Sequence, residues 1–258
     1  MTVKHELTIQ IGISMKIMDK VILVTGGATR LGRAMSLYFA KKGAKIFCHY
    51  HSSKDEAVSL KNEIELFGGN IALFQYDLMK DDAPQKIYRA ALDRFSTIDI
   101  LINNAALFYK TPFGKIKPQD WDIFHTLNLK SAFFLAQEVS RVMLRQKSGK
   151  IINIADSAAE TPFPSYLPYS ISKAGIITMT KGLAKVLAPH VQVNCIAPGP
   201  VLFPQNYDKK EKQFAIEQTL LKREGAPEDI VKALEFLIKN GDYITGTVLP
   251  VDGGRHIG

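Results

Sequence analysis

Hydrophobic and polar positions follow two alternating patterns along the chain from Val21 onward. Short runs of mostly apolar residues are separated by longer stretches in which apolar residues recur at helical spacing. The short runs predict strands at Val21–Thr25, Lys45–Tyr50, Ile71–Tyr76, Ile98–Ile102, Lys150–Ile154, Val191–Ile196 and Thr247–Val251. The longer stretches predict helices near residues 30–42, 54–67, 82–95, 118–146, 169–188 and 227–239.

Strands that are apolar throughout and alternate with helices are typical of a parallel sheet covered on both faces. No linker or shift in composition divides residues 15–258, so we predict one α/β domain there. Its fold class is a Rossmann-like, doubly wound parallel sheet of about seven strands, with ligands at the carboxyl ends of the strands. Residues 1–14 alternate only weakly, and we expect an N-terminal extension that forms an edge strand or a tail.

Composition narrows the possible partners. No apolar run approaches the roughly 18 residues that a membrane span needs, so no membrane partner is expected. The net charge is +8, but the densest basic cluster, Lys209 to Lys212, is interrupted by Glu211. A positive field of this kind favours a polyanionic cofactor over nucleic acid. The two cysteines, Cys48 and Cys195, lie in predicted strands and form no disulfide framework, which favours the cytoplasm; no metal site is expected.

A glycine-rich turn follows the first predicted strand and leads directly into the first predicted helix. Its sequence is TGGATRLG: Gly26 lies in the turn itself, and Arg30, Leu31 and Gly32 lie at the start of that helix. Glycines allow backbone N–H groups to approach a pyrophosphate, and a helix N-terminus offers further unpaired N–H groups. We therefore predict a dinucleotide cradle here, with Arg30 as a cation beside the phosphates.

The end of the second predicted strand indicates which nicotinamide dinucleotide binds. A carboxylate at this place would bind the adenosine 2′-hydroxyl and repel a 2′-phosphate. The chain instead has CHYHSSK, with no acidic residue before Asp55. The imidazoles of His49 and His51 and the hydroxyl of Ser52 suit a phosphate group, so we predict NADPH rather than NADH.

Tyr169 and Lys173 are four residues apart at the start of a predicted helix, which places a phenol and an ammonium on one face. A free phenol has a pKa of about 10, and a neighbouring ammonium is expected to lower it towards neutrality. Asp156 follows the strand that ends at Ile154, and the intervening loop could return it to the same site. These three residues are the candidate catalytic group.

These motifs together resemble the short-chain dehydrogenases/reductases over nearly all of residues 20–254. The similar segments are Thr25–Gly32, Asp77-Leu78, Asn103-Asn104-Ala105, Asn128, Tyr169 with Lys173, Pro198-Gly199 and Val251–Gly254. The resemblance implies that Asp77, Leu78, Asn104, Ala105, Pro198 and Gly199 contact the cofactor together with the glycine loop and with Tyr169 and Lys173. It also implies that Asn128 holds a water on a proton relay, and that the protein is a homotetramer paired through the helices near 118–146 and 169–188.

Two departures resemble the pteridine reductase branch of that family. Asp156 stands where most members have a serine, and Arg30 replaces a small residue of the glycine loop. The His49–Ser52 segment is similar to that branch's 2′-phosphate loop, and Phe108 and Tyr166 correspond to its substrate-binding aromatics. Substrate contacts are thus expected from Phe108, Arg30, Asp156, Tyr166 and Tyr169. The family's usual threonine after Pro198-Gly199 is missing, and residues 201–221 are expected to form a substrate lid.

The resemblance implies NADPH-dependent reduction of a pterin or dihydropterin, with Asp156 and Tyr169 as proton donors. A carboxylic acid suits this reaction because hydride addition to a ring C=N leaves a nitrogen that needs a proton. A carbonyl reductase of the same fold, acting on a 3-oxoacyl thioester or a small ketone, remains open as an alternative. A non-catalytic nucleotide-binding protein is the third possibility, and Asn128, Tyr169 and Lys173 argue against it.

Overall fold

The computed structural model describes residues 15–204 and 207–258, which form a seven-stranded, entirely parallel sheet. The strands are β1 (Val21–Thr25), β2 (Lys45–Tyr50), β3 (Asn70–Gln75), β4 (Ile100–Asn103), β5 (Gly149–Ile154), β6 (Val191–Pro198) and β7 (Val248–Val251). Their order is β3-β2-β1-β4-β5-β6-β7, so the winding reverses between β1 and β4. Ligands of such sheets bind beyond the carboxyl ends of the strands at that reversal.

Alternate side chains of each central strand enter two separate cores. Ile22 and Val24 of β1 pack into one hydrophobic cluster, whereas Leu23 packs into another on the opposite face. Phe47 of β2 and Leu101 of β4 belong to the same cluster as Leu23. Both faces of the sheet are therefore buried, which explains why the strands read as continuous apolar runs rather than as an alternation.

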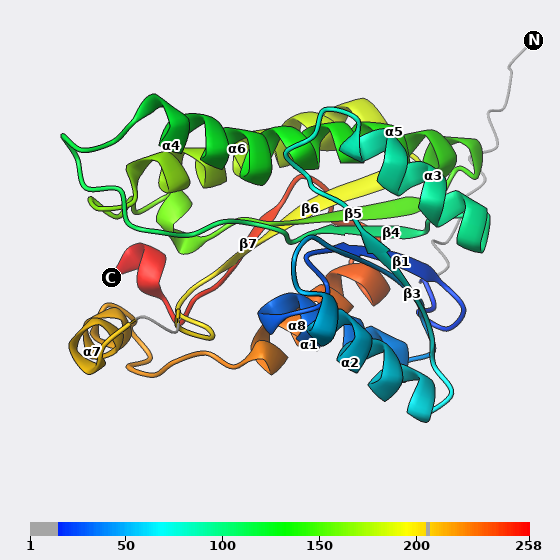
Figure 1. The fold of residues 1–258 in the computed structure, drawn as a ribbon, viewed down its shortest axis with the longest axis horizontal. Coiled ribbons are helices and arrows are strands. Elements are labelled where there is room, and N and C mark those ends of the chain that lie inside the picture. The colour runs from blue at the N-terminus through cyan, green and yellow to red at the C-terminus, as the bar shows by residue number, and fades with distance from the viewer. Residues whose placement is uncertain (1–14, 205–206) are drawn as a thin grey trace, which may run out of the picture.

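Helices cover the two faces in two groups (Figure 1). One face carries α1 (Arg30–Lys41), α2 (Lys54–Leu66) and α8 (Pro227–Lys239). The other carries α3 (Ala83–Phe95), α4 (Pro118–Phe124), α5 (Ser131–Arg145) and α6 (Leu167–Leu187). The short helix α7 (Lys209–Glu217) and the C-terminal turn η3 (Arg255–Ile257) lie apart from these layers, at the end of the molecule beyond the sheet.

The structure confirms the fold class and refines several predicted boundaries. The helix predicted near 118–146 is divided, because a π-helical segment, η1 (His125–Lys130), separates α4 from α5. Helix α6 begins at Leu167 rather than at Tyr169, and α7 was not among the predicted helices. The prediction for residues 1–14 lies outside the described residues. None of the helices in the described part of the chain is long and apolar enough to cross a membrane.

Candidate active site

The glycine-rich turn between β1 and α1 forms a tight, open cradle. Gly26 has a φ of +60°, and a Cβ on Gly32 would lie 2.0 Å from the Gly26 carbonyl oxygen. Asn104, which follows β4, donates from Nδ2 to the carbonyls of Thr25 and Gly26 at 2.9 and 3.2 Å. The N-cap residue of α1, Thr29, makes no side-chain capping bond. The first N–H groups of α1 therefore remain available to an anion, so the turn fits the pyrophosphate of a dinucleotide.

Replacing Gly32 by alanine should damage this cradle selectively. The added Cβ meets the Gly26 carbonyl and, at 2.8 Å, Asn104 Nδ2, so the turn must shift away from its binding geometry. We expect the Kd for NADPH to rise at least tenfold, as measured by titration calorimetry. Gly182→Ala in α6 is the matched control, since a Cβ there meets nothing within 4 Å. Gly182→Ala should leave NADPH binding unchanged, because alanine is favoured over glycine in a helix. Equal NADPH binding by the two variants would contradict the assignment of the glycine-rich turn as the pyrophosphate site.

His49 lies beneath the glycine turn rather than at the surface. Its ring is 1% exposed; Nδ1 accepts from the Gly26 N–H at 3.4 Å, and Nε2 lies 3.0 Å from the Tyr76 carbonyl oxygen. Burial lowers the pKa of His49 to about 4, so the ring is neutral near pH 7. The prediction that His49 binds the 2′-phosphate directly is therefore wrong, because a buried neutral ring supports the turn from below. His51 and Ser52 follow β2 and are exposed.

The remaining predicted cofactor residues lie around the carboxyl ends of the strands. The backbone N–H groups of Asn104 and Ala105 both donate to Thr25 Oγ1 at 3.0 Å, which ties β4 to β1 at the winding reversal. Asp77 and the buried Leu78 follow β3, and the Asp77 carboxylate accepts from the Met79 N–H at 2.9 Å. At the end of β6, Pro198 is followed by Gly199, whose N–H donates to the Val251 carbonyl of β7 at 3.1 Å.

Asp156 and Tyr169 form a hydrogen-bonded pair in which Tyr169 is buried and Asp156 is half-buried. The Tyr169 hydroxyl donates to Asp156 Oδ2 at 2.6 Å, and Asp156 Oδ1 accepts from the Ala158 N–H at 2.7 Å. Asp156 stands just beyond β5, and Tyr169 lies in the first turn of α6, so the intervening loop brings them together as predicted. The 2.6 Å separation of the two oxygens is typical of a strong, charge-assisted O–H···O hydrogen bond.

Burial dominates the titration of this pair. It raises the pKa of Asp156 from its ordinary value, and the hydrogen bonds from Tyr169 and Ala158 oppose that rise only in part. Burial also raises the pKa of Tyr169 well above its ordinary value, and the neighbouring Asp156 carboxylate raises it further. The prediction that Lys173 lowers the pKa of Tyr169 is thus wrong in this structure. Near neutral pH the phenol is protonated, which suits a proton donor rather than a base.

Lys173 is anchored to the end of β5. Its Nζ donates to the Ile154 carbonyl at 2.8 Å and lies 5.8 Å from the centre of the Tyr169 ring. Burial lowers the pKa of Lys173, although the Asp156 carboxylate raises it in return. The ammonium therefore lies under the aromatic ring, close to the end of β5.

Asn128 lies in the π-helical segment η1, and π-helical turns occur frequently at functional sites. Its Oδ1 accepts from the Leu107 N–H at 2.9 Å, and its Nδ2 donates to the Ser172 hydroxyl at 3.1 Å. Beside it is a small cavity of about 10 Å³, lined by polar groups that include Asn103, Asn128 and Lys173. That volume is of the order of one water molecule, so the cavity has room for the water that the family resemblance implies on Asn128.

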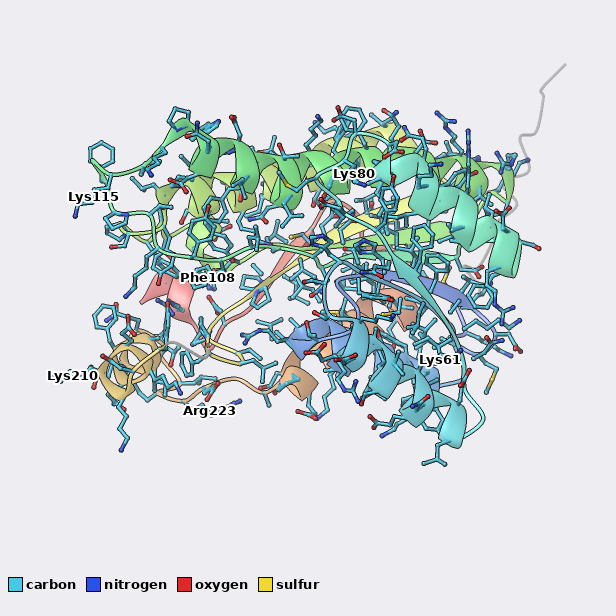
Figure 2. All side chains as sticks on the ribbon, in the orientation of Figure 1. Lys61, Lys80, Phe108, Lys115, Lys210 and Arg223 are labelled. Carbon is cyan, nitrogen blue, oxygen red and sulfur yellow. The ribbon has the colours of Figure 1, made fainter. Side chains whose placement is uncertain are left out.

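An aromatic cleft of about 600 Å³ opens in front of the Asp156–Tyr169 pair. Phe108 stacks on Tyr166 with ring centres 4.5 Å apart and planes within 5°, and it meets Tyr169 edge-on at 4.8 Å. Figure 2 shows Phe108 at the same end of the sheet as α7 and η3. The cleft therefore has a flat apolar wall next to two proton-donating groups.

The segment after Pro198-Gly199 covers this cleft. Arg30 has a φ of +49° and donates from its guanidinium to the carbonyls of Leu202 and Phe203. The hydroxyls of Tyr166 and Tyr207 are 2.9 Å apart, and Lys110 is paired with Glu211 of α7. Residues of the described part of 201–221 thus line the cleft, and Arg30 contacts this segment as well as belonging to the glycine turn.

Sequence reasoning missed several residues that line the cleft. They are Lys110, Phe163, Tyr207, Phe214 and Arg255. Tyr207, Phe214 and Arg255 reach the cleft only through the tertiary fold, so no spacing rule connects them to Tyr169. Lys110 and Phe163 lie in the loops that also carry Phe108 and Tyr166. Among the described residues no group of three or more His, Cys, Asp or Glu side chains is placed to hold a metal ion.

Comparison with known proteins identifies relatives of the whole domain. A family model described as short chain dehydrogenase matches residues 20–213. The 3-oxoacyl-[acyl-carrier-protein] reductase of Synechocystis sp. is 36% identical over 238 residues, covering 91% of this chain and 96% of that protein. The corresponding FabG enzyme of Thermotoga maritima is 32% identical over 244 residues, covering 93% and 99%.

Similar solved structures agree with this assignment. FolM Alternative dihydrofolate reductase 1 from Brucella canis, complexed with NADP, superposes with a TM-score of 0.88 at 30% identity, covering 94% of this chain and 96% of that one. A short-chain dehydrogenase/reductase from Serratia marcescens gives the same TM-score and identity, covering 94% and 100%. The chain therefore belongs to the short-chain dehydrogenase/reductase family of oxidoreductases, which use a nicotinamide cofactor.

Proposed function

We propose that the protein reduces a pterin or dihydropterin with NADPH, as a pteridine reductase does. The observation that supports this most strongly is the half-buried Asp156 carboxyl, which lies 2.6 Å from the Tyr169 hydroxyl and lines an aromatic cleft. A flat heterocycle that accepts hydride at carbon needs a proton at nitrogen, and this pair can supply it. Dihydrofolate reductase is also the activity named for the similar Brucella canis protein.

The cofactor would lie along the carboxyl ends of the strands. Gly26, Leu31 and Gly32 would hold its pyrophosphate; Asp77, Leu78, Asn104, Ala105, Pro198, Gly199, Tyr169 and Lys173 would surround its remaining parts. The exposed His51 and Ser52 would contact the 2′-phosphate, and the absence of an acidic side chain between β2 and Asp55 favours NADPH over NADH. When bound, the nicotinamide supplies the hydride.

Asp156 and Tyr169 would together hold and deliver the proton. Burial raises the pKa of each group, which shifts both towards their protonated, proton-donating forms. Lys173 and Asn128 border the small cavity, and Lys173 Nζ lies 5.8 Å from the centre of the Tyr169 ring. A water held there would connect the pair to solvent after each turnover.

Phe108 and Tyr166 would hold the substrate ring. Their stacked rings offer a flat wall, and aromatic stacking contributes roughly 0.5–1.5 kcal/mol beyond the burial of area. Arg30 stands where the glycine turn and the lid meet, so its guanidinium can contact the substrate as well as the phosphates.

The second candidate is reduction of a 3-oxoacyl thioester, which the names of the curated relatives favour. The observation against it is Asp156. A ketone needs only a hydrogen-bond donor for its developing alkoxide, and a hydroxyl is sufficient for that. A carboxyl hydrogen-bonded to the tyrosine is better matched to a ring nitrogen.

A substrate panel tests this proposal. NADPH oxidation is measured at fixed enzyme concentration with dihydrobiopterin, dihydrofolate and acetoacetyl-coenzyme A, and repeated with NADH. We expect a kcat/KM for at least one pterin that is at least 100-fold above that for the thioester, and at least tenfold higher with NADPH than with NADH. Turnover of the thioester alone would establish the second candidate, and equal or better turnover with NADH would refute the cofactor assignment.

We further propose that the protein is a cytoplasmic homotetramer. Large apolar side chains are exposed along α4, α5 and α6, where copies would pair; they are Trp121, Phe133, Phe134, Leu144 and Ile171. Packing of these helices against a second copy would cover them. Cys48 and Cys195 are both buried free thiols, as is usual in a reducing compartment.

A further inference from the structure

Arg255 reaches the cleft from the C-terminal turn, whose backbone is held by Asp252. Asp252 Oδ1 accepts from the Gly254 N–H at 2.9 Å. Its Oδ2 accepts from the His256 N–H at 2.9 Å and lies 2.8 Å from His256 Nδ1. Gly254 itself has a φ of +80°, so the chain turns sharply just before Arg255. The direction of the Arg255 side chain is thus fixed by a buried carboxylate whose oxygens are already engaged.

The guanidinium of Arg255 is partly buried and has no oxygen partner among residues 15–204 and 207–258. It lies over the Phe163 ring at 4.5 Å and lines the same cleft as Asp156. Burial lowers the pKa of Arg255, while the Asp156 carboxylate raises it. Asp156 acts on Arg255 only through its charge, because its carboxyl oxygens accept from Tyr169 and Ala158 and make no hydrogen bond with the guanidinium. A partly buried cation without a hydrogen-bond acceptor is costly, and a bound anion would remove that cost.

The other cations that line the cleft are engaged. Lys110 pairs with Glu211, and Arg30 donates to the carbonyls of Leu202 and Phe203. In the described lining, Arg255 is thus the cation without an oxygen partner, whereas Lys110 and Arg30 each already have one. Figure 1 shows its turn, η3, between α7 and the layer formed by α4 and α6, at the open end of the molecule. That position suits the tail of a substrate whose ring lies deeper, against Phe108.

We propose that Arg255 binds a carboxylate on the tail of the substrate. This inference rests on the proposed function and narrows it: the preferred substrate is a pterin with an anionic tail, as in dihydrofolate, rather than one with a neutral side chain, as in dihydrobiopterin. A guanidinium can hold a carboxylate by two parallel hydrogen bonds, and stacking on Phe163 leaves its edge free to do so.

The first test is a change in substrate preference in Arg255→Gln. We expect the ratio of kcat/KM for dihydrofolate to kcat/KM for dihydrobiopterin to fall 10- to 100-fold, mainly through the KM for dihydrofolate. Arg255→Lys keeps the charge but cannot make two parallel hydrogen bonds to a carboxylate, so its ratio of kcat/KM values should lie between those of the wild type and Arg255→Gln. The KM for dihydrofolate should rise with salt in the wild type and much less in Arg255→Gln. Arg223→Gln is the matched control, because Arg223 pairs with Asp229 on an exposed loop outside this cleft (Figure 2); its ratio should equal that of the wild type.

A second readout does not need turnover. p-Aminobenzoyl-glutamate carries the tail without the pterin ring, and its binding to the NADP-loaded enzyme is followed by titration calorimetry. We expect Arg255→Gln to weaken that binding at least tenfold. If Arg255→Gln weakens fragment binding but the wild-type protein reduces no pterin, Arg255 is confirmed as an anion-binding residue and the proposed function is refuted. An unchanged substrate ratio, or equal fragment binding in wild type and variant, would overturn the role of Arg255. If Arg255→Gln lowers kcat/KM for a phosphate-bearing thioester but leaves binding of the fragment unchanged, Arg255 binds the phosphate of the rival substrate. That result would overturn the proposal that Arg255 binds a carboxylate.

Discussion

Asp156→Asn should lower kcat for pterin reduction by about 10²- to 10⁴-fold, the range that general acid catalysis contributes. Asparagine preserves the shape of the side chain and can still accept from the Ala158 N–H, but it cannot release a proton to a ring nitrogen. Stopped-flow or steady-state NADPH oxidation with a dihydropterin measures the loss. Binding of NADPH should change less than threefold, because Asp156 contacts Tyr169 and Ala158 rather than the glycine turn.

The pH dependence of this variant separates chemistry from structure. Burial raises the pKa of Asp156, so the wild-type rate should stay high at low pH and fall as pH rises through that raised value. Asp156→Asn should lose most of its activity, and its remaining rate should no longer decrease as the pH rises through this range. Asp156→Ser restores the residue that most of the family has here, and it should lose pterin reduction while keeping or gaining reduction of a ketone thioester. Pterin turnover unchanged in either variant would refute the assigned role.

Tyr169→Phe should lower kcat by about 10²- to 10⁴-fold for every substrate, whether pterin or ketone. The phenol is the donor that both reactions share. Its raised pKa means that the hydroxyl is protonated near neutral pH, so the variant lacks a group that is ready to donate a proton. The aromatic ring still packs against Phe108 and Phe124, and we expect the melting temperature to change by only a few degrees.

Tyr109→Phe is the matched control for that experiment. The Tyr109 hydroxyl also donates to a carboxylate, Asp120 Oδ1 at 3.1 Å, but Tyr109 does not line the cleft. Its kcat should stay within a factor of three of wild type. A Tyr169→Phe enzyme that keeps most of its activity on ketones, or a Tyr109→Phe enzyme that loses as much, would show that the hydroxyl of Tyr169 is not the common donor.

The sequence predicts those parts of the site that local pattern controls. The glycine turn is recognisable because Gly26 and Gly32 stand between an apolar run and a helical pattern, and their spacing imposes the turn. Asp156 and Tyr169 meet because one ends a strand and the other begins the next helix, at the edge where parallel strands present their carboxyl ends. The register of the sheet follows from the same apolar runs.

Burial and long-range contacts account for what the sequence does not predict. His49 belongs to a motif that suits a phosphate, but its ring turns beneath Gly26, where desolvation keeps it neutral. The expected effect of Lys173 on Tyr169 fails for a similar reason, since burial and Asp156 outweigh an ammonium that is bound to the Ile154 carbonyl. Arg255 reaches the cleft through the C-terminal turn, and no spacing within the chain indicates that return.

The most direct test of the account is a crystal structure of the protein with NADP and a bound dihydropterin. We expect a pterin ring parallel to the Phe108 ring and facing the nicotinamide. A ring nitrogen should lie within hydrogen-bond distance, about 2.6–3.2 Å, of Asp156 or of the Tyr169 hydroxyl. A pterin held elsewhere, or one whose ring nitrogens contact neither residue, would contradict the central claim that this pair protonates the substrate.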